Sequence, residues 1–128
     1  MHERVLVVDD ERSIAQALGI RLRAAGYDVQ CAFDGFSGLA AAREWRPAAI
    51  VLDIRMPDID GFEVNRRLRA QPELASTPVI FLSANVQESA RQAALAAGAQ
   101  AFLTKPYESG DVLAAVRSAL EDREPSGV

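Results

Sequence analysis

The stretch Ala-Ala-Ile-Val-Leu-Asp-Ile-Arg-Met-Pro-Asp-Ile-Asp-Gly, residues 48–61, decides the expected fold. Its first part, residues 48–52, is a continuous apolar run that ends at a charged residue, Asp53. An apolar run without alternation is typical of a strand in a parallel sheet, because such strands are buried on both faces. Residues 55–61 contain proline, aspartate and glycine and are expected to form a loop. The stretch therefore predicts a buried strand that carries a carboxylate at its end.

Three more apolar runs are followed by polar or charged residues. Residues 5–8 precede Asp9 and Asp10, residues 79–82 precede Ser83, and residues 101–104 precede Lys105. A charge at the end of a buried strand costs free energy unless another charge compensates it. If these strands are neighbours in a parallel sheet, the acids and the lysine converge in one crevice. Such a cluster suits a hard metal ion and a phosphoryl group.

The spacing of apolar residues predicts a regular alternation of strands and helices. The expected strands are residues 4–8, 29–32, 48–52, 79–82 and 101–104, and a helix is expected after each of them. This pattern predicts an α/β fold, a flavodoxin-like doubly wound sheet of five parallel strands with five helices. For the strand order 2-1-3-4-5, ligands bind near the carboxyl ends of the first and third strands, where the order switches.

Length and composition fit one ordinary globular domain. The 128 residues are 49% hydrophobic and 25% charged, and the formal net charge of -4 argues against direct nucleic-acid binding by this domain. The single cysteine, Cys31, excludes an internal disulfide. Neither a signal peptide nor a membrane span is expected, so we predict a cytoplasmic protein. Residues 1–123 form the predicted domain, and residues 124–128 a C-terminal tail or the start of a linker.

The carboxylates at the strand ends are candidate ligands for Mg²⁺, which prefers oxygen and keeps several waters. Two unit charges about 4 Å apart repel by roughly 4 kcal/mol at an effective dielectric of about 20, so clustered acids need a cation, a proton or Lys105. Asp9 or Asp10 could instead cap the following helix, but capping does not explain Asp53 at the same edge. Asp53 could act as a nucleophile toward a phosphoryl group. Ser83 could then bind a phosphoryl oxygen, or be an ordinary turn residue.

Four motifs in order resemble those of the receiver domain of two-component response regulators. They are Val-Val-Asp-Asp-Glu at residues 7–11, Leu-Asp-Ile-Arg-Met-Pro-Asp-Ile-Asp-Gly at 52–61, Leu-Ser-Ala at 82–84 and Phe-Leu-Thr-Lys-Pro at 102–106. The resemblance extends over residues 4–123. It implies that Asp53 is the phosphoacceptor and that Lys105 is the lysine of the site. It also implies that Asp9, Asp10 and Asp53 hold Mg²⁺ together with the backbone carbonyl of Arg55.

The same resemblance implies a switch and a tunable phosphoryl lifetime. Ser83 matches the Ser or Thr that binds the phosphoryl group. Phe102 matches the aromatic residue that turns inward when Ser83 moves, although it could also be a simple core aromatic. Arg55 and Asn85 match the two positions that tune the lifetime, and the sequence does not fix that lifetime.

The implied function is that of a phosphoacceptor in a two-component system or phosphorelay, which catalyses only its own phosphorylation and dephosphorylation. A histidine kinase or histidine phosphotransfer protein would donate the group, and a downstream protein or fused output domain would read the result. His2, the only histidine, is a poor candidate for a phosphorelay histidine. The alanine-rich segment 88–97 is expected to belong to a mobile signalling face.

Three alternatives remain open at this point. A haloacid-dehalogenase-like phosphatase would use Asp9 as its nucleophile, but it would leave Asp53 without a role. A flavodoxin-type flavin module is disfavoured because the acidic residues 9–11 would repel a phosphate. A receiver fold could also serve as a docking module that does not depend on phosphorylation.

Some expectations concern structure alone. Cys31 is expected to be a buried strand residue, and the arginines at 66, 67 and 69 are expected on a solvated helix face. The sequence does not decide whether the peptide bond between Lys105 and Pro106 is cis or trans.

Overall fold

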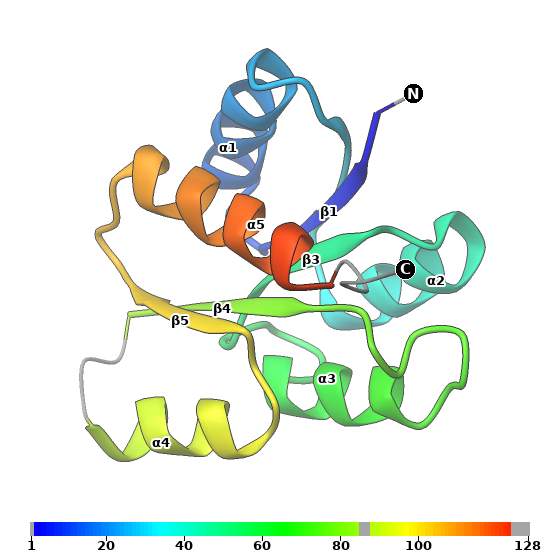
Figure 1. The fold of residues 1–128 in the computed structure, drawn as a ribbon. Coiled ribbons are helices and arrows are strands. Elements are labelled where there is room, and N and C mark those ends of the chain that lie inside the picture. The colour runs from blue at the N-terminus through cyan, green and yellow to red at the C-terminus, as the bar shows by residue number, and fades with distance from the viewer. Residues whose placement is uncertain (1, 85–87, 124–128) are drawn as a thin grey trace.

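A computed structural model describes residues 2–84 and 88–123 as a parallel sheet covered by helices on both faces (Figure 1). The strands are β1 (Arg4–Val8), β2 (Asp28–Ala32), β3 (Ala49–Asp53), β4 (Val79–Ser83) and β5 (Ala101–Thr104). The helices are α1 (Arg12–Ala24), α2 (Gly35–Trp45), α3 (Gly61–Arg69), α4 (Glu88–Ala96) and α5 (Ser109–Arg123). The strands lie in the order β2-β1-β3-β4-β5, so the predicted α/β class and strand order are confirmed.

The sheet separates two apolar cores. Val5 and Val7 of β1 belong to the core on the face of α1 and α5, whereas Leu6 and Val8 belong to the core on the face of α2, α3 and α4. Successive side chains of a strand point to opposite faces, so both sets of β1 residues are buried. This arrangement explains why the strands read as continuous apolar runs.

Two of the expected strands extend one residue further than the sequence predicts. Asp53 is the last residue of β3 and pairs with Leu82, and Ser83 is the last residue of β4 and pairs with Thr104. Backbone hydrogen bonds continue the ladder past both positions: the N–H of Ile54 donates to the carbonyl of Leu82 at 3.0 Å, and the N–H of Lys105 donates to that of Ser83 at 2.7 Å. The polar residues are thus fixed by the sheet itself.

The helices begin and end at residues with clear local causes. Asp34 caps α2 and Asp60 caps α3, each through its side chain, which satisfies N–H groups that a helix leaves unpaired in its first turn. Gly26 after α1 and Gly98 after α4 have φ values of 103° and 89°. Only glycine adopts this conformation without strain, so both positions terminate a helix.

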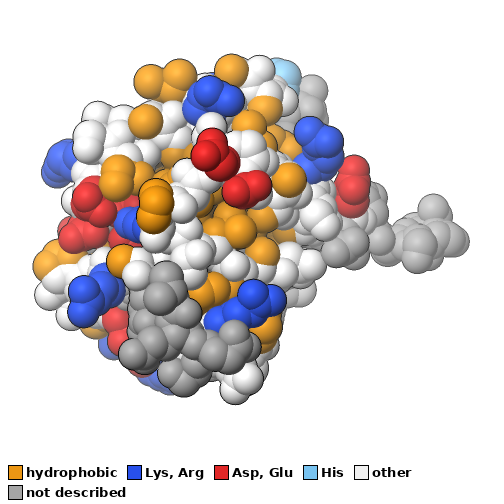
Figure 2. Space-filling view, turned by 90° about the vertical axis from the view of Figure 1, so that its left-hand side faces the viewer, with side chains coloured by type: hydrophobic (Ala, Val, Ile, Leu, Met, Phe, Trp, Pro, Cys, Tyr) orange, Lys and Arg blue, Asp and Glu red, His pale blue; other side chains and the backbone are white. Residues whose placement is uncertain are grey.

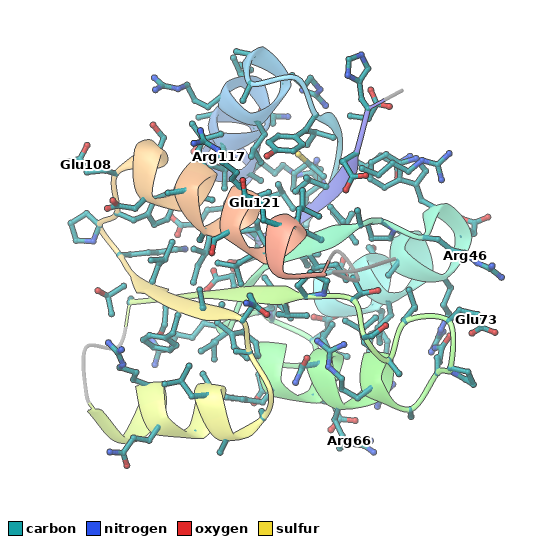
Figure 3. All side chains as sticks on the ribbon, viewed as in Figure 1. Arg46, Arg66, Glu73, Glu108, Arg117 and Glu121 are labelled. Carbon is teal, nitrogen blue, oxygen red and sulfur yellow. The ribbon has the colours of Figure 1, made fainter. Side chains whose placement is uncertain are left out.

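Two structural expectations were wrong. Cys31 is only partly buried, because β2 is an edge strand whose side chains are less completely covered. Arg66 points away from the sheet (Figure 3) and is exposed, but Arg69 is partly buried and donates to the carbonyls of Leu74 and Ala75 at 3.0 and 2.9 Å. Arg69 therefore holds the connection between α3 and β4 instead of lying on a solvated face.

The bond between Lys105 and Pro106 is cis. Among the described residues, no helix is both long and apolar enough to cross a membrane. The predicted tail or linker at residues 124–128 lies outside the described part of the chain.

Candidate functional site

The carboxyl edge of the sheet gathers charged side chains from three strands. Asp9 follows β1, Asp53 ends β3, and Lys105 follows β5. The parallel register aligns these strand ends, since Val8 pairs with Leu52 and Ser83 pairs with Thr104. Figure 2 looks onto this edge and shows acidic and basic side chains set among apolar ones.

Three carboxylates meet in this region. One oxygen from each of Asp9, Asp10 and Asp53 lies within 4.8 Å of the others. Asp9 and Asp53 are buried, with 0% and 4% relative exposure, whereas Asp10 is exposed. Oxygen donors from acids suit Mg²⁺, and an exposed member leaves room for the waters that this ion keeps. The residues present therefore fit a hard divalent cation.

The alternative that Asp9 or Asp10 caps α1 is wrong. The N-cap residue of α1 is Glu11, and its side chain makes no capping hydrogen bond. Asp9 Oδ1 instead accepts the backbone N–H of Glu11 at 3.0 Å, which fixes the orientation of the buried carboxylate. The second oxygen, Asp9 Oδ2, accepts a hydrogen bond from Lys105 Nζ.

Lys105 connects the acids. Its Nζ donates to Asp53 Oδ2 at 3.0 Å, to Asp9 Oδ2 at 3.2 Å and to Glu11 Oε1 at 3.3 Å. Burial alone would lower the pKa of Lys105, but the hydrogen bond to Asp53 and the charges of Asp53 and Asp9 raise it overall. Lys105 is therefore an ammonium ion at neutral pH, and it compensates part of the negative charge.

Asp53 ionises less readily than an ordinary aspartate. Burial raises the pKa of Asp53 to about 6, the hydrogen bond from Lys105 opposes this shift, and the charge of Asp9 adds to it. One ammonium facing several carboxylates leaves the cluster with excess negative charge. This electrostatic state favours a bound cation at the same place.

The end of β3 also sets the backbone that follows Asp53. The N–H of Arg55 donates to Asp53 Oδ1 at 3.4 Å, which places the backbone of Arg55 beside the carboxylates. The N–H of Gly61 donates to the carbonyl of Ile54 at 2.7 Å and closes the loop between β3 and α3. A Cβ atom at Gly61 would meet the carbonyl oxygen of Asp53 at 2.6 Å, so only glycine fits there.

The predicted switch residues lie on neighbouring strands. Ser83 is buried, with 2% relative exposure. Phe102 is partly buried, pairs with Phe81 of β4 and packs against the core on the face of α2, α3 and α4. Ser83 lies two residues after Phe81 on β4, and Phe81 is the residue that pairs with Phe102. A movement of Ser83 would therefore occur close to Phe102. Asn85, the second predicted lifetime position, lies outside the described residues.

Glu11 is a site residue to which the sequence assigned no role. Its carboxylate is one of the three partners of Lys105, and its side chain is 57% exposed. The available signal was its position directly after Asp9 and Asp10 in the same loop. An apolar groove with a volume of about 790 Å³ adjoins the site, between α1 and the segment Lys105–Pro106–Tyr107. Lys105 thus borders both the acidic cluster and this groove.

The chain matches known proteins over nearly its whole length. It is 41% identical over 124 residues to the DNA-binding dual master transcriptional regulator RpaA of Synechocystis, with 95% of this chain and 52% of that protein covered. It is 40% identical over 125 residues to the response regulator MprA of Mycobacterium tuberculosis, with 98% and 54% covered. The chain therefore spans about half the length of the curated relatives it matches.

Solved structures show the same fold. The receiver domain of the Francisella response regulator 1452 superposes with a TM-score of 0.90 and 32% identity, covering 96% of this chain and all of that one. The chemotaxis response regulator CheY4 of Vibrio cholerae superposes with a TM-score of 0.87 and 34% identity, covering 94% of this chain and 100% of that one. The family model of the response regulator receiver domain matches residues 5–117. The chain belongs to the family of response regulator receiver domains.

Proposed function

We propose that Asp53 accepts a phosphoryl group from a phosphohistidine and thereby switches the surface of this domain. Receiver domains are signalling modules and not conventional enzymes, and nothing in the comparisons favours a phosphatase. The observation that carries the proposal is the position of Asp53, which is buried at a strand end, bonded to Lys105 and within reach of two further acids. Asp9, the nucleophile of the phosphatase alternative, is fixed by Lys105 and by the N–H of Glu11.

In the proposed transfer, an oxygen of Asp53 attacks the phosphorus atom, the P–N bond to the donor histidine breaks, and the imidazole leaves and takes up a proton. Catalysis of such a transfer depends on positioning and on neutralising the charge of the phosphoryl oxygens. Lys105 is already held at the acceptor and supplies one positive charge. Ser83 is proposed to donate a hydrogen bond to a phosphoryl oxygen, because it ends the strand next to Asp53.

Asp9, Asp10 and Asp53 are proposed to hold Mg²⁺, together with the backbone carbonyl of Arg55. The convergence of the three carboxylates and the raised pKa of Asp53 support this assignment. When bound, the ion neutralises charge on the acceptor and the phosphoryl group and orients both. A bound ion would therefore add its positive charge to that of Lys105 at the acceptor.

The response to phosphorylation is proposed to pass through Ser83 and Phe102. Ser83 would move toward the phosphoryl group, and Phe102 would turn into the space this movement leaves. The two conformations would exist beforehand, with phosphorylation shifting their populations. Arg55 and Asn85 are proposed to tune the phosphoryl lifetime, since they match the positions that flank the path of the attacking water.

A histidine kinase or histidine phosphotransfer protein is the proposed donor, and a downstream protein or fused output domain the proposed reader. The greater length of the curated relatives supports an output domain beyond this chain. One relative is named a DNA-binding regulator, but the net charge of -4 makes this domain an unsuitable surface for DNA. The cytoplasmic location predicted from the sequence remains part of this proposal.

The proposal can be tested by incubation with acetyl phosphate and Mg²⁺, followed by intact mass spectrometry. We expect a single phosphoryl adduct on the natural chain, none without Mg²⁺ and none on Asp53→Asn. Asp28→Asn, which changes an exposed aspartate at the start of β2, is the matched control and should be modified normally. An adduct that persists in Asp53→Asn would contradict the assignment of the acceptor. Repeated turnover of a phosphomonoester would instead favour a phosphatase.

A further inference from the structure

The loop between β3 and α3 is tied to the start of α2 by one carboxylate. Asp58 Oδ1 accepts the backbone N–H of Gly35 at 2.9 Å, and Asp58 Oδ2 accepts that of Phe36 at 2.8 Å. The partners are more than 20 residues apart in the chain. The proposed acceptor loop is therefore bonded to a helix that supplies no residue to the site.

The bonds of Asp58 complete the first turn of α2. Asp34, the N-cap residue, accepts the N–H of Ser37 at 2.7 Å. Asp58 takes the two preceding N–H groups, which no residue inside the helix can bond. The positive end of the helix dipole also favours a carboxylate at this place. Asp34 is the residue directly before the helix, whereas Asp58 belongs to the acceptor loop.

Close packing holds the same two segments together. A Cβ atom at Gly35 would meet Cγ1 of Ile59 at 2.5 Å and the carbonyl oxygen of Ile59 at 2.9 Å. Ile59 in turn packs against the core on the face of α2, α3 and α4. The loop and the helix start are in direct contact, so a shift of one displaces the other.

The residues between the acceptor and this contact are few. Asp58 lies five positions after Asp53, with Arg55 between them. The N–H of Arg55 bonds to Asp53 Oδ1, and the loop is closed by the bond from Gly61 to Ile54. The backbone of Arg55 is thus held from one side by the end of β3 and from the other by the contact with α2.

We propose that Asp58 is a positioning residue, which holds the loop against α2 so that the backbone of Arg55 stays at the carboxylate cluster. Asp58 makes no contact with the acceptor itself, so it acts through the loop. Loss of this tie lets the loop move away and weakens the metal site without removing any of its acids. The effect of Asp58 on Mg²⁺ binding rests on the proposed function, whereas its effect on the position of the loop does not.

The test compares Asp58→Ala with Asp34→Ala. Both variants remove one carboxylate from the start of α2, but only the first also releases the loop. By calorimetric titration with Mg²⁺ alone, we expect the dissociation constant to rise about tenfold in Asp58→Ala, at the lower end of the range for residues that orient metal ligands indirectly, and less than about twofold in Asp34→Ala. Both variants should retain a cooperative urea transition, because Asp58 and Asp34 lie outside the core.

Amide hydrogen exchange without metal gives a reading that does not depend on Mg²⁺. The amide of Gly61 should exchange about fivefold faster in Asp58→Ala and at the natural rate in Asp34→Ala. Asp58→Asn keeps one acceptor oxygen and should give intermediate values. Gly35→Ala, which pushes on Ile59 from the helix side, should weaken Mg²⁺ binding in the same direction as Asp58→Ala.

Equal effects of Asp58→Ala and Asp34→Ala on both measurements would overturn the inference, because the carboxylate would then serve only the helix. A natural chain that does not bind Mg²⁺ would contradict the proposed metal site. In that case the exchange rate of Gly61 still decides whether Asp58 holds the loop.

Discussion

Asp53 is buried beside another acid, and the sign of its contribution to stability follows from its pKa. Burial and the charge of Asp9 raise this pKa to about 6, although Lys105 opposes the shift. The value in an unfolded chain is about 3.9. Between these two values the folded state binds more protons than the unfolded state, so stability falls as the pH rises through this window. Ionised Asp53 is therefore destabilising at neutral pH in the absence of metal.

Asp53→Asn should accordingly stabilise the metal-free domain at pH 7.5. The expected gain in the free energy of unfolding is about 2 kcal/mol, and it should nearly vanish at about pH 3, where the natural residue is mostly protonated in both states. Urea unfolding at the two pH values measures the difference. Asp28→Asn, at an exposed position, should change neither value. A loss of stability for Asp53→Asn at pH 7.5 would show that the ionised carboxylate stabilises the fold, which is the opposite sign.

Lys105→Met, in contrast to Asp53→Asn, should lower the free energy of unfolding of the metal-free domain. It removes the ammonium that faces Asp9, Glu11 and Asp53, and leaves the buried Asp9 and Asp53 without this cation. Breaking a buried ion pair by removing one side costs about 3 kcal/mol, and this loss should be largest at pH 7.5. Added Mg²⁺ should restore part of it, because the ion supplies the missing charge.

The control for this variant is Arg117→Met (Figure 3), which removes an exposed cation from the middle of α5. Urea titrations with and without Mg²⁺ should show an ion-dependent recovery for Lys105→Met and none for Arg117→Met. Equal responses of the two variants would mean that Mg²⁺ acts on the protein surface in general.

At the scale of elements, the approach of α3 to β3 depends on Gly61. A Cβ atom there would meet the carbonyl oxygen of Asp53 at 2.6 Å and the Cα atom of Ile54 at 2.8 Å. These are backbone atoms that cannot move alone, so Gly61→Ala should lower the free energy of unfolding by about 3 kcal/mol. Gly110→Ala on α5 meets nothing within 4 Å and should instead be stabilising by about 0.5 kcal/mol. Thermal unfolding of the two variants measures the contrast.

Among the described side chains, α4 has fewer fully buried residues than any other helix of the domain. Among its described side chains only Ala94 is fully buried, while Leu95 is 45% exposed. Alanine buries little apolar area, so the packing of α4 contributes less than that of a leucine-rich helix. We expect beryllofluoride with Mg²⁺ to change the amide exchange of residues 88–96 severalfold. Unchanged protection there would place the signalling face on another part of the domain.

At the scale of the whole molecule, the sequence predicts the order of the elements and the position of those site residues that directly follow a strand. The continuous apolar runs define the order of elements, and each charged residue after a run marks the same edge of the sheet. The convergence of Asp9, Asp10, Asp53 and Lys105 is therefore predictable from the order of residues alone. The strand boundaries were one residue short at Asp53 and Ser83, because only pairing across the ladder shows where a strand stops.

Contacts made by loops could not be predicted in this way. Glu11 reaches Lys105 across 94 positions of sequence, and Asp58 reaches the start of α2 across 22 or more. Arg69 was expected in solvent but bonds to carbonyls of the following turn. Each of these contacts depends on the path of an irregular segment, for which hydrophobic periodicity carries no signal.

Lys105 is the only lysine of the chain, and every other permanently cationic side chain is arginine. A reagent that acylates or methylates amines therefore has a single side-chain target, enclosed by three acids and 15% exposed. Because such reagents require the neutral amine, and the acids raise the pKa of this one, labelling of the folded chain should be slow. A ¹³C-methyl group placed there would give one resonance, whose shift reports the charge state of the whole site.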